Sequence, residues 1–246
     1  MRDQKGFTLV ELAISLVVIG LLIGGILKGQ ELIENSKINA TIRDLENIQS
    51  AVSMFESAYD YLPGDIPNPR GRIPNCEAAL CSTGGNGNWK IFLRSGVSDP
   101  EAEAYNFFPH MTKAGFLAAP EGGTLAPTAA TRDRWDKLVP TLPLNKSKLY
   151  IHYQTSNETW GSTGRILYPG HYFEVLPTTV GSIYSTAPYF AREHYNGRQM
   201  FIIDTKMDDG RPQSGLVWGG RCAEGDWSSN QYDMKATCSL KMKARF

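Results

Sequence analysis

A single carboxylate lies inside an apolar stretch that is long enough to cross a membrane. Residues 7–27 hold one charged side chain, Glu11, among leucines, isoleucines and valines. As a helix, this stretch is about 30 Å long, which matches the hydrocarbon thickness of a bilayer. An unpaired acid in that layer costs roughly 2.5–3.5 kcal/mol. The chemistry that Glu11 predicts is therefore ion pairing with a cation in apolar surroundings.

The residues around Glu11 carry a processing motif. A polar leader ends at Gly6 and the apolar run follows at once, whereas a secretory signal peptide has a shorter apolar region and a small-residue cleavage site after it. The run Gly6-Phe7-Thr8-Leu9-Val10-Glu11 resembles the cleavage and methylation site of the type IV pilin and type II secretion pseudopilin superfamily. The resemblance implies that a prepilin peptidase cuts after Gly6 and methylates Phe7, and that the apolar helix becomes the core of a helical fibre.

The charge that cleavage creates offers a partner for Glu11. A new α-amino group on Phe7 would be largely protonated at neutral pH. In an apolar core an ammonium and a carboxylate attract each other by several kcal/mol, and a misaligned pair leaves two charges unpaired. We therefore expect Glu11 to accept the Phe7 ammonium of a neighbouring subunit, so that charge pairing sets the register of assembly.

Four cysteines fall into two pairs that are close in sequence, Cys76 with Cys81 and Cys222 with Cys238. In an exported head these pairs should be oxidised, and closing the second loop stabilises the fold by roughly 3 kcal/mol on the chain-entropy model. Four cysteines allow three connectivities, and nearness in sequence is the only ground for this one. A late cysteine pair that frames a loop also resembles many type IV pilins. Zinc is disfavoured because the chain has no CxxC.

Three acids, Asp204, Asp208 and Asp209, come shortly before Gly210. They could supply oxygen ligands to calcium. Some pseudopilins of the superfamily that this chain resembles carry calcium near the C-terminal part of the head. Their spacing does not match an EF-hand loop. The alternative is an acidic helix end followed by a turn at Gly210. Both interpretations stay open, and no cofactor other than calcium is predicted.

Four other stretches resemble segments that recur in prepilin-like proteins, and the resemblance assigns them no role. They are residues 62–65, 84–88, 110–117 and 203–210.

Nothing in the sequence predicts catalysis. The four histidines are scattered, and there is no HExxH, no GxSxG elbow, no phosphate-cradling loop and no dinucleotide fingerprint. The formal net charge is zero, which gives no reason to expect binding to nucleic acid. We predict a protein that is not an enzyme.

A long helix should position the N-terminal motif. Beyond Lys28, apolar residues recur every three or four positions up to Tyr59, which predicts an amphipathic continuation that Pro63-Gly64 stops. A coiled-coil dimer is the alternative, but a break after three heptads favours packing within the chain. We divide the chain into a leader at 1–6, a membrane and fibre-core helix at 7–28, an amphipathic helix at 29–61 and a globular head at 62–246.

The head should combine strands and short helices. Residues 149–153, 172–176 and 215–218 read as strands, and so does the C-terminus, where apolar residues alternate with Lys241, Lys243 and Arg245 on a solvated face. A helix is predicted at 188–196 with Gly197 as its stop, while 199–207 is ambiguous. The fold class is therefore α+β, with the long helix packed on an antiparallel sheet. This agrees with the pilin fold that the resemblance implies.

These observations favour a structural subunit of a type IV pilus or a secretion pseudopilus, and the size of the chain favours a minor subunit. The resemblance implies a single pass through a bacterial inner membrane, with the N-terminus in the cytoplasm before assembly and the head in the periplasm or on the cell surface. It implies as partners other pilin subunits, the prepilin peptidase and the inner-membrane assembly platform. The alternative is a membrane-anchored or tip-located adhesin, whose head binds a ligand that the sequence does not identify.

Overall fold

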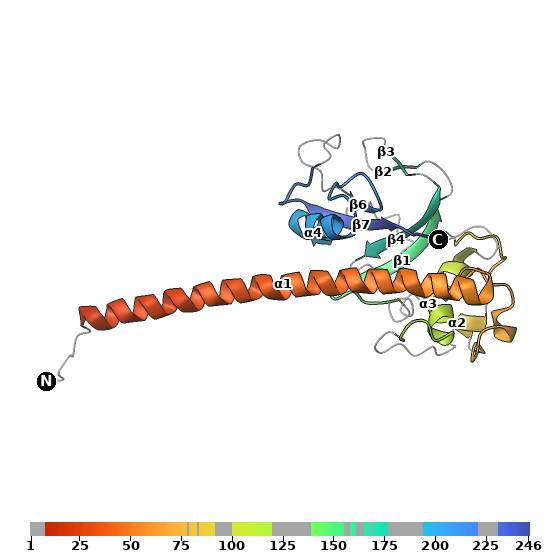
Figure 1. The fold of residues 1–246 in the computed structure, drawn as a ribbon, viewed down its shortest axis with the longest axis horizontal. Coiled ribbons are helices and arrows are strands. Elements are labelled where there is room, and N and C mark those ends of the chain that lie inside the picture. Colours follow the sequence, from red (N-terminus) through yellow and green to blue (C-terminus); the bar gives the residue numbers. More distant parts are fainter. Residues whose placement is uncertain are drawn as a thin grey trace.

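A computed structural model shows a long helix with a head packed along its C-terminal half (Figure 1). The structure describes residues 8–77, 79–82, 84–91, 100–119, 139–154, 158–160, 165–167, 169–176, 194–220 and 231–246. The head is built on an antiparallel sheet, and the helix lies along it. The predicted α+β fold class is confirmed.

The helix α1 (Leu9–Tyr59) is continuous over 51 residues. Thr8 is its N-cap, and Asp60 ends it in the left-handed conformation, with a φ of 57° and an N–H that donates to the carbonyl of Glu56. The helix thus ends before Pro63-Gly64, the predicted stop. Aspartate tolerates the left-handed region better than most residues, so Asp60 can close the last turn itself.

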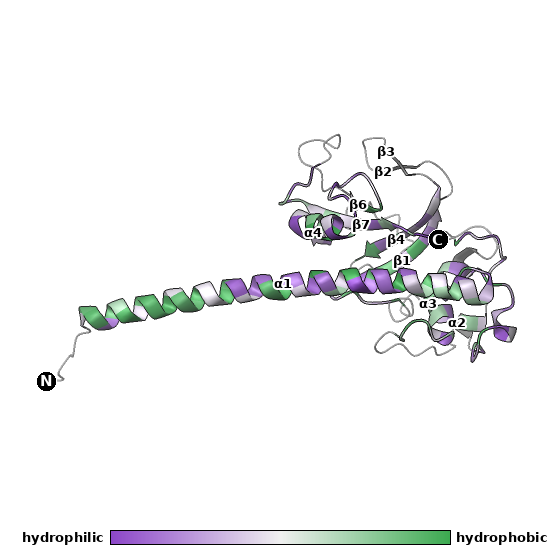
Figure 2. Ribbon diagram, in the orientation of Figure 1, coloured by the Kyte–Doolittle hydropathy of each residue, from purple (hydrophilic) through white to green (hydrophobic). Residues whose placement is uncertain are grey.

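The two halves of α1 have different surroundings. Side chains from Leu9 to Leu27 are exposed, and Figure 2 shows that they form the most apolar part of the helix. By length and composition, α1 can cross a membrane. Farther along, one face is buried against the head, with the spacing that the sequence predicted. The buried residues are Ile38, Thr41, Ile42, Leu45, Ile48, Ala51, Val52 and Phe55.

The main sheet has five strands. They are β1 (Lys148–Gln154), β4 (Gly170–Leu176), β5 (Tyr195–Asn196), β6 (Val217–Gly220) and β7 (Thr237–Lys243). Their order is β1-β4-β7-β5, β6 also pairs with β7, and all these pairs are antiparallel. A separate antiparallel pair is formed by β2 (Glu158–Trp160) and β3 (Arg165–Leu167). The strands predicted at 149–153, 172–176 and the C-terminus are confirmed, while the one predicted at 215–218 begins at Val217.

Four shorter helices complete the described part of the head. They are η1 (Pro69–Gly71), α2 (Ala79–Ser82), α3 (Pro100–Lys113) and α4 (Gly197–Met207). The stretch that the sequence left ambiguous, residues 199–207, is helical.

The helix predicted at 188–196 is wrong where the structure describes it. Tyr195 and Asn196 form β5, and Gly197 begins α4 instead of ending a helix. The Asn196 side chain accepts the N–H of Gln199, whose side-chain oxygen in turn accepts the N–H of Asn196, so the pair is a capping box. Gly197 is required by close packing, because a Cβ there would lie 1.8 Å from the carbonyl oxygen of Asp233.

One core joins the buried face of α1 to the apolar face of the sheet. In the sheet, Phe173 of β4 lies opposite both Ile151 of β1 and Met242 of β7, and all three are buried. Two polar contacts tie α1 to the head beside this core. Gln49 Nε2 donates to Met242 Sδ at 3.4 Å, and the N–H of Leu144 donates to Thr41 Oγ1 at 3.0 Å.

The alternation in β7 buries its apolar residues as predicted, but the prediction that its lysines face solvent is wrong for Lys241, which is 3% exposed. Lys241 lies opposite the buried Glu174 in the register of β4 and β7. Its Nζ is 5.4 Å from the centroid of the Tyr172 ring. A carboxylate and an aromatic face offset the desolvation of the ammonium, so the charge can be buried.

We expect Gly197→Ala to lower the free energy of unfolding by about 1–3 kcal/mol, because the added methyl group must displace backbone atoms. Urea unfolding of the full chain in detergent measures this loss. Gly71→Ala is the matched control, since its nearest neighbour would be 3.6 Å away. We expect it to change the stability by no more than about 0.5 kcal/mol. Equal stability of the two variants would contradict the close approach at Gly197.

Candidate functional site

The N-terminal end of α1 engages Glu11 within its own chain. The N–H and Oγ1 of Thr8 donate to Glu11 Oε2 at 2.9 and 2.8 Å, and the N–H of Glu11 donates to Thr8 Oγ1 at 3.3 Å. This capping box satisfies donors that a helix start leaves open. The predicted processing residues, Gly6 and Phe7, lie outside the described residues. They come directly before this cap in the sequence, so cleavage would place the new amine one residue from it.

The glycines of the apolar half of α1 pack against none of the residues that the structure describes. A Cβ added at Gly20, Gly24, Gly25 or Gly29 would meet no atom within 4 Å. Each glycine costs close to 1 kcal/mol of helix propensity relative to alanine. In the described part of the chain, no contact requires a small side chain at these four positions.

The disulfide between Cys76 and Cys81 is formed as predicted, with both residues buried and their Cα atoms 5.0 Å apart. Cys238 also takes part in a disulfide. Its predicted partner, Cys222, lies outside the described residues.

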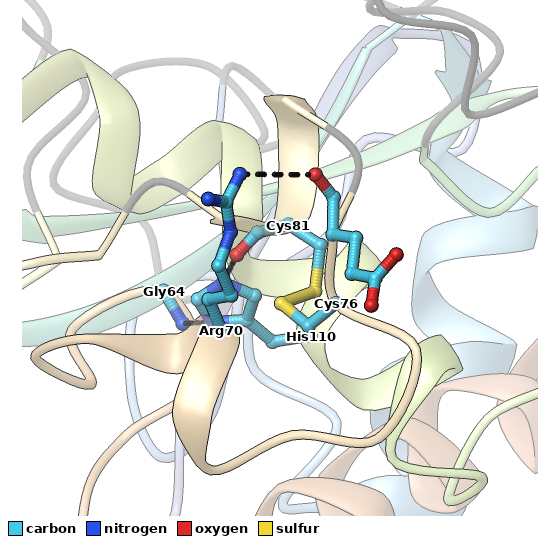
Figure 3. The surroundings of a disulfide bond; sticks show 6 residues. Gly64, Arg70, Cys76, Cys81 and His110 are labelled. Carbon is cyan, nitrogen blue, oxygen red and sulfur yellow. Dashed lines mark hydrogen bonds between the residues drawn. A yellow bond between two sulfur atoms is a disulfide. The ribbon is translucent and has the colours of Figure 1, made fainter.

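A buried histidine joins this disulfide to two other segments (Figure 3). His110 Nδ1 accepts the N–H of Gly64 at 2.9 Å, and its Nε2 lies 2.9 Å from the carbonyl oxygen of Cys81. Because an amide N–H can only donate and a carbonyl can only accept, the ring carries its proton on Nε2 and is neutral. His110 therefore fixes α3, the turn after α1 and the disulfide loop relative to one another.

The residue after Gly64 organises a second loop. Asp65 is buried, and its carboxylate accepts the N–H groups of Gly87 at 2.8 Å and Trp89 at 2.6 Å. Burial raises the pKa of Asp65, although these N–H groups act in the opposite direction. A Cβ at Gly85 would lie 2.4 Å from the Asp65 Cα, so the loop needs glycine there.

Three of the four stretches that resemble prepilin-like proteins thus meet at one place. His110 belongs to 110–117 and contacts 62–65, which in turn holds 84–88 through Asp65. Their common role in this chain is to build the loop region that follows the end of α1. The spacing of these residues in the sequence does not predict their contacts, since the partners are 22 to 46 positions apart.

The predicted calcium ligands lie together. Carboxylate oxygens of Asp204, Asp208 and Asp209 are all within 4.8 Å of one another. Burial, together with the charges of Asp209 and Asp208, raises the pKa of Asp204 to about 7, against an opposing hydrogen bond from Tyr232. Such a cluster is stabilised by a proton or by a cation.

The same carboxylates also hold the chain after α4. The Tyr232 hydroxyl donates to Asp204 Oδ2 at 2.7 Å, and the Ser214 hydroxyl donates to Asp209 Oδ2 at 2.6 Å. Asp208 accepts the N–H groups of Leu216 and Val217. The cluster has a structural role whether or not an ion binds, and calcium here stays a prediction.

The other three histidines make separate contacts, although His152 and His171 lie on the paired strands β1 and β4, at adjacent positions of their register. His171 Nε2 accepts the N–H of Ile91 at 3.1 Å, and burial lowers its pKa to about 4. His152 Nδ1 lies 4.0 Å from the carboxylate of Glu174 on the neighbouring strand. His194 and Asn145 link two loops through Nε2 and a carbonyl oxygen 2.8 Å apart. The contacts described for these side chains are structural.

Comparison with known proteins gives one match, at the N-terminus. The family model described as "Prokaryotic N-terminal methylation motif" matches residues 1–27. This is the signature of type IV pilins and pseudopilins, and it supports a pilin-like or pseudopilin precursor that is a structural subunit and assembles with other pilin subunits after prepilin peptidase processing. No curated protein and no solved structure matches the chain.

We expect His110→Ala to destabilise the head by about 2–5 kcal/mol, because it leaves the Gly64 N–H and the Cys81 carbonyl unpaired in the interior. Urea unfolding of the full chain in detergent measures the change. His194→Ala, whose hydrogen bond is exposed, is the control and should cost less than about 1 kcal/mol. Equal losses in the two variants would show that His110 does not join the three segments.

The raised pKa of Asp204 predicts a pH dependence. The folded state keeps the proton up to about pH 7, whereas the unfolded chain releases it near the ordinary aspartate pKa of 3.8. The stability of the wild type should therefore fall as pH rises from about 4 to about 7, by at most about 1.4 kcal/mol per pH unit. Asp204→Asn removes this titration, so its stability relative to wild type should rise over the same range. Unfolding midpoints across that range, with Asp233→Asn as control, measure the difference, and parallel profiles would contradict it.

The same variants test the calcium prediction. If calcium binds, adding it at pH 8 raises the unfolding midpoint of the wild type and of Asp233→Asn, but not that of Asp204→Asn. No rise in the wild type would remove calcium as a ligand of this cluster.

Proposed function

We propose that this chain is the precursor of a minor subunit of a type IV pilus or a type II secretion pseudopilus. A prepilin peptidase cleaves it after Gly6 and methylates Phe7, and the subunit is stored in the inner membrane with its N-terminus in the cytoplasm and its head outside. The assembly platform then moves it into a fibre, on or beneath the cell surface. The observation that carries the proposal is the N-terminal methylation motif, which runs directly into the fully exposed apolar half of α1.

The exposed half of α1 supports assembly through the helix. Large apolar side chains from Leu9 to Leu27 are 48% to 87% exposed, and the described part of the head covers none of them. Lipid covers such a surface before assembly, and the helices of other subunits cover it in a fibre. This surface performs no chemistry of its own, which fits a structural subunit.

The capping box at Thr8 supports a role for Glu11 in both environments. In the isolated chain, two donors from Thr8 reduce the cost of holding the carboxylate near apolar surroundings. In a fibre, the ammonium on Phe7 of a neighbouring subunit supplies a full positive charge at the same carboxylate. Since an ion pair in apolar surroundings is stronger than a hydrogen bond from a neutral donor, a correctly registered neighbour completes the site.

One observation favours the second candidate, an adhesin or binding module at the fibre tip. Trp89 is 42% exposed and has a φ of 62°, a conformation that bulky residues rarely adopt. Arg72 lies 5.0 Å from the centroid of the Tyr61 ring, and Lys90 lies 5.4 Å from that of Tyr153. Trp89 and Arg72 are exposed, and tryptophan and arginine are among the residues that dominate binding energy in interfaces.

The loop that carries Trp89 is held by Asp65, five residues after the helix cap, and so lies at the end of the head far from the N-terminus (Figure 1). Purified fibres separate the two candidates. Subunits spaced along the shaft support the structural role, and subunits confined to the tip support the adhesin.

We expect Glu11→Leu to insert into the membrane and to be cleaved, but to enter fibres at least tenfold less than wild type, because the ammonium of the neighbour then has no carboxylate. Sheared fibres and membranes are quantified by immunoblot, and the mass of the mature chain confirms cleavage. Ser15→Ala is the control, since Ser15 lies one turn away and donates only to the Glu11 carbonyl. Normal assembly of Glu11→Leu would contradict the hypothesis that Glu11 pairs with the Phe7 ammonium.

A further inference from the structure

The end of the head nearest the apolar half of α1 is formed by the start of α4 and the turn before β7. Arg198 in the first turn of α4 donates to Glu31 of α1 at 2.9 Å. Gly197 packs against the turn that contains Asp233 and Met234. Figure 1 shows α4 beside α1, close to the point where the head begins.

The height of this end above the bilayer follows from helix geometry, once the proposed function is granted and residues 7–27 lie in the hydrocarbon layer. Glu31 follows Leu27 by four residues, or about 6 Å along the helix. Headgroups add roughly 5–7 Å on each side of the hydrocarbon. The Arg198 guanidinium, which contacts Glu31, therefore lies within the headgroup layer and not in free solution.

Exposed cations lie at this height together with acids that have donors from this chain. Lys28, Arg198 and Lys235 are exposed. Glu31 accepts hydrogen bonds from both Lys28 and Arg198. Two other acids among the described residues here also have donors from this chain, since Glu34 accepts from Gln199 and Asp233 accepts the N–H of Lys235. A guanidinium has five N–H donors, so one bond to Glu31 leaves Arg198 able to bind a phosphate.

Apolar side chains stand beside these cations. Leu32 and Ile33 on α1 are 61% and 58% exposed, and Met234 in the turn before β7 is 48% exposed. Cations that alternate with exposed apolar residues are typical of protein surfaces that lie at the membrane interface. The composition of this surface thus fits the layer in which its height places it.

We propose that Lys28, Arg198 and Lys235, together with Leu32, Ile33 and Met234, form a headgroup-binding surface. Its ligand is the phosphate of anionic phospholipids in the leaflet that faces the head. Bound there, the head is held in one orientation on the bilayer while the subunit awaits assembly. Extraction into a fibre breaks these contacts, and the surface then turns toward other subunits.

Hydrogen exchange of the full chain in lipid nanodiscs tests this proposal. The lipids are phosphatidylcholine alone or with one third phosphatidylglycerol. We expect amides of 197–201 and 233–236 to exchange at least threefold more slowly with phosphatidylglycerol present, and amides of 66–73, at the far end of the head, to be unchanged. Lys235→Glu and Arg198→Gln should each abolish most of the difference. Lys90→Glu, which alters an exposed lysine at the far end, should retain it.

Two variants are used so that a loss of protection can be distinguished from a change in folding. Arg198→Gln also removes a hydrogen bond to Glu31, whereas Lys235 makes no described side-chain contact with α1. The proposal is overturned if both lipids give the same exchange, or if the lipid effect survives in Lys235→Glu. Protection of residues 9–27 reports membrane insertion separately. Loss of that protection would contradict the proposed function, whereas protection without a lipid effect on the head would contradict this inference alone.

Discussion

An apolar helix surface that the chain does not cover with its own head governs this structure. The side chains from Leu9 to Leu27 are exposed throughout, and each large apolar residue gains roughly 1.5–3 kcal/mol when it leaves water. Added over this half of α1, the gain far exceeds the net stability of an ordinary domain. The surface must therefore be in lipid or against other helices. In both states it is buried by other molecules, so the stabilising free energy comes from contacts that this chain alone does not make.

The head is built so that it leaves this surface open. Along α1, the residues buried in the core run from Ile38 to Phe55, so they begin well after Leu27, the last residue of the exposed apolar half, and end shortly before the Asp60 cap. Polar contacts fix the interface between α1 and the rest of the head at both of its ends. Arg198 holds α4 to Glu31 at the near end, and His110 and Asp65 hold the loops that follow α1 at the far end. The second half of α1 is consequently part of the head, and it connects the head to the exposed apolar half of the helix.

Charged groups are handled in the same way along the chain. Glu11 accepts a hydrogen bond from Thr8, and Asp204 accepts one from Tyr232. Glu174 lies opposite Lys241 on the neighbouring strand. A carboxylate in apolar surroundings is costly without donors, and each of these has donors or a cation from its own chain. Of these three carboxylates, only Glu11 lies on the exposed apolar half of α1, so the change of partner that we propose for assembly concerns this carboxylate.

The amino-acid sequence by itself determined the long helix, its division into exposed and one-sided apolar halves, the processing motif, the Cys76–Cys81 pair and the main strands. These features are set by local pattern, by residue spacing of two or 3.6, or by short loops. Tertiary structure alone decided the others. Lys241 is buried because Glu174 and Tyr172 are brought beside it from another strand, and Gly197 begins a helix because the Asp233 carbonyl occupies the space of a Cβ. His110, Asp65 and the near end of α4 likewise take their roles from partners far away in the chain, and no periodicity encodes such distances.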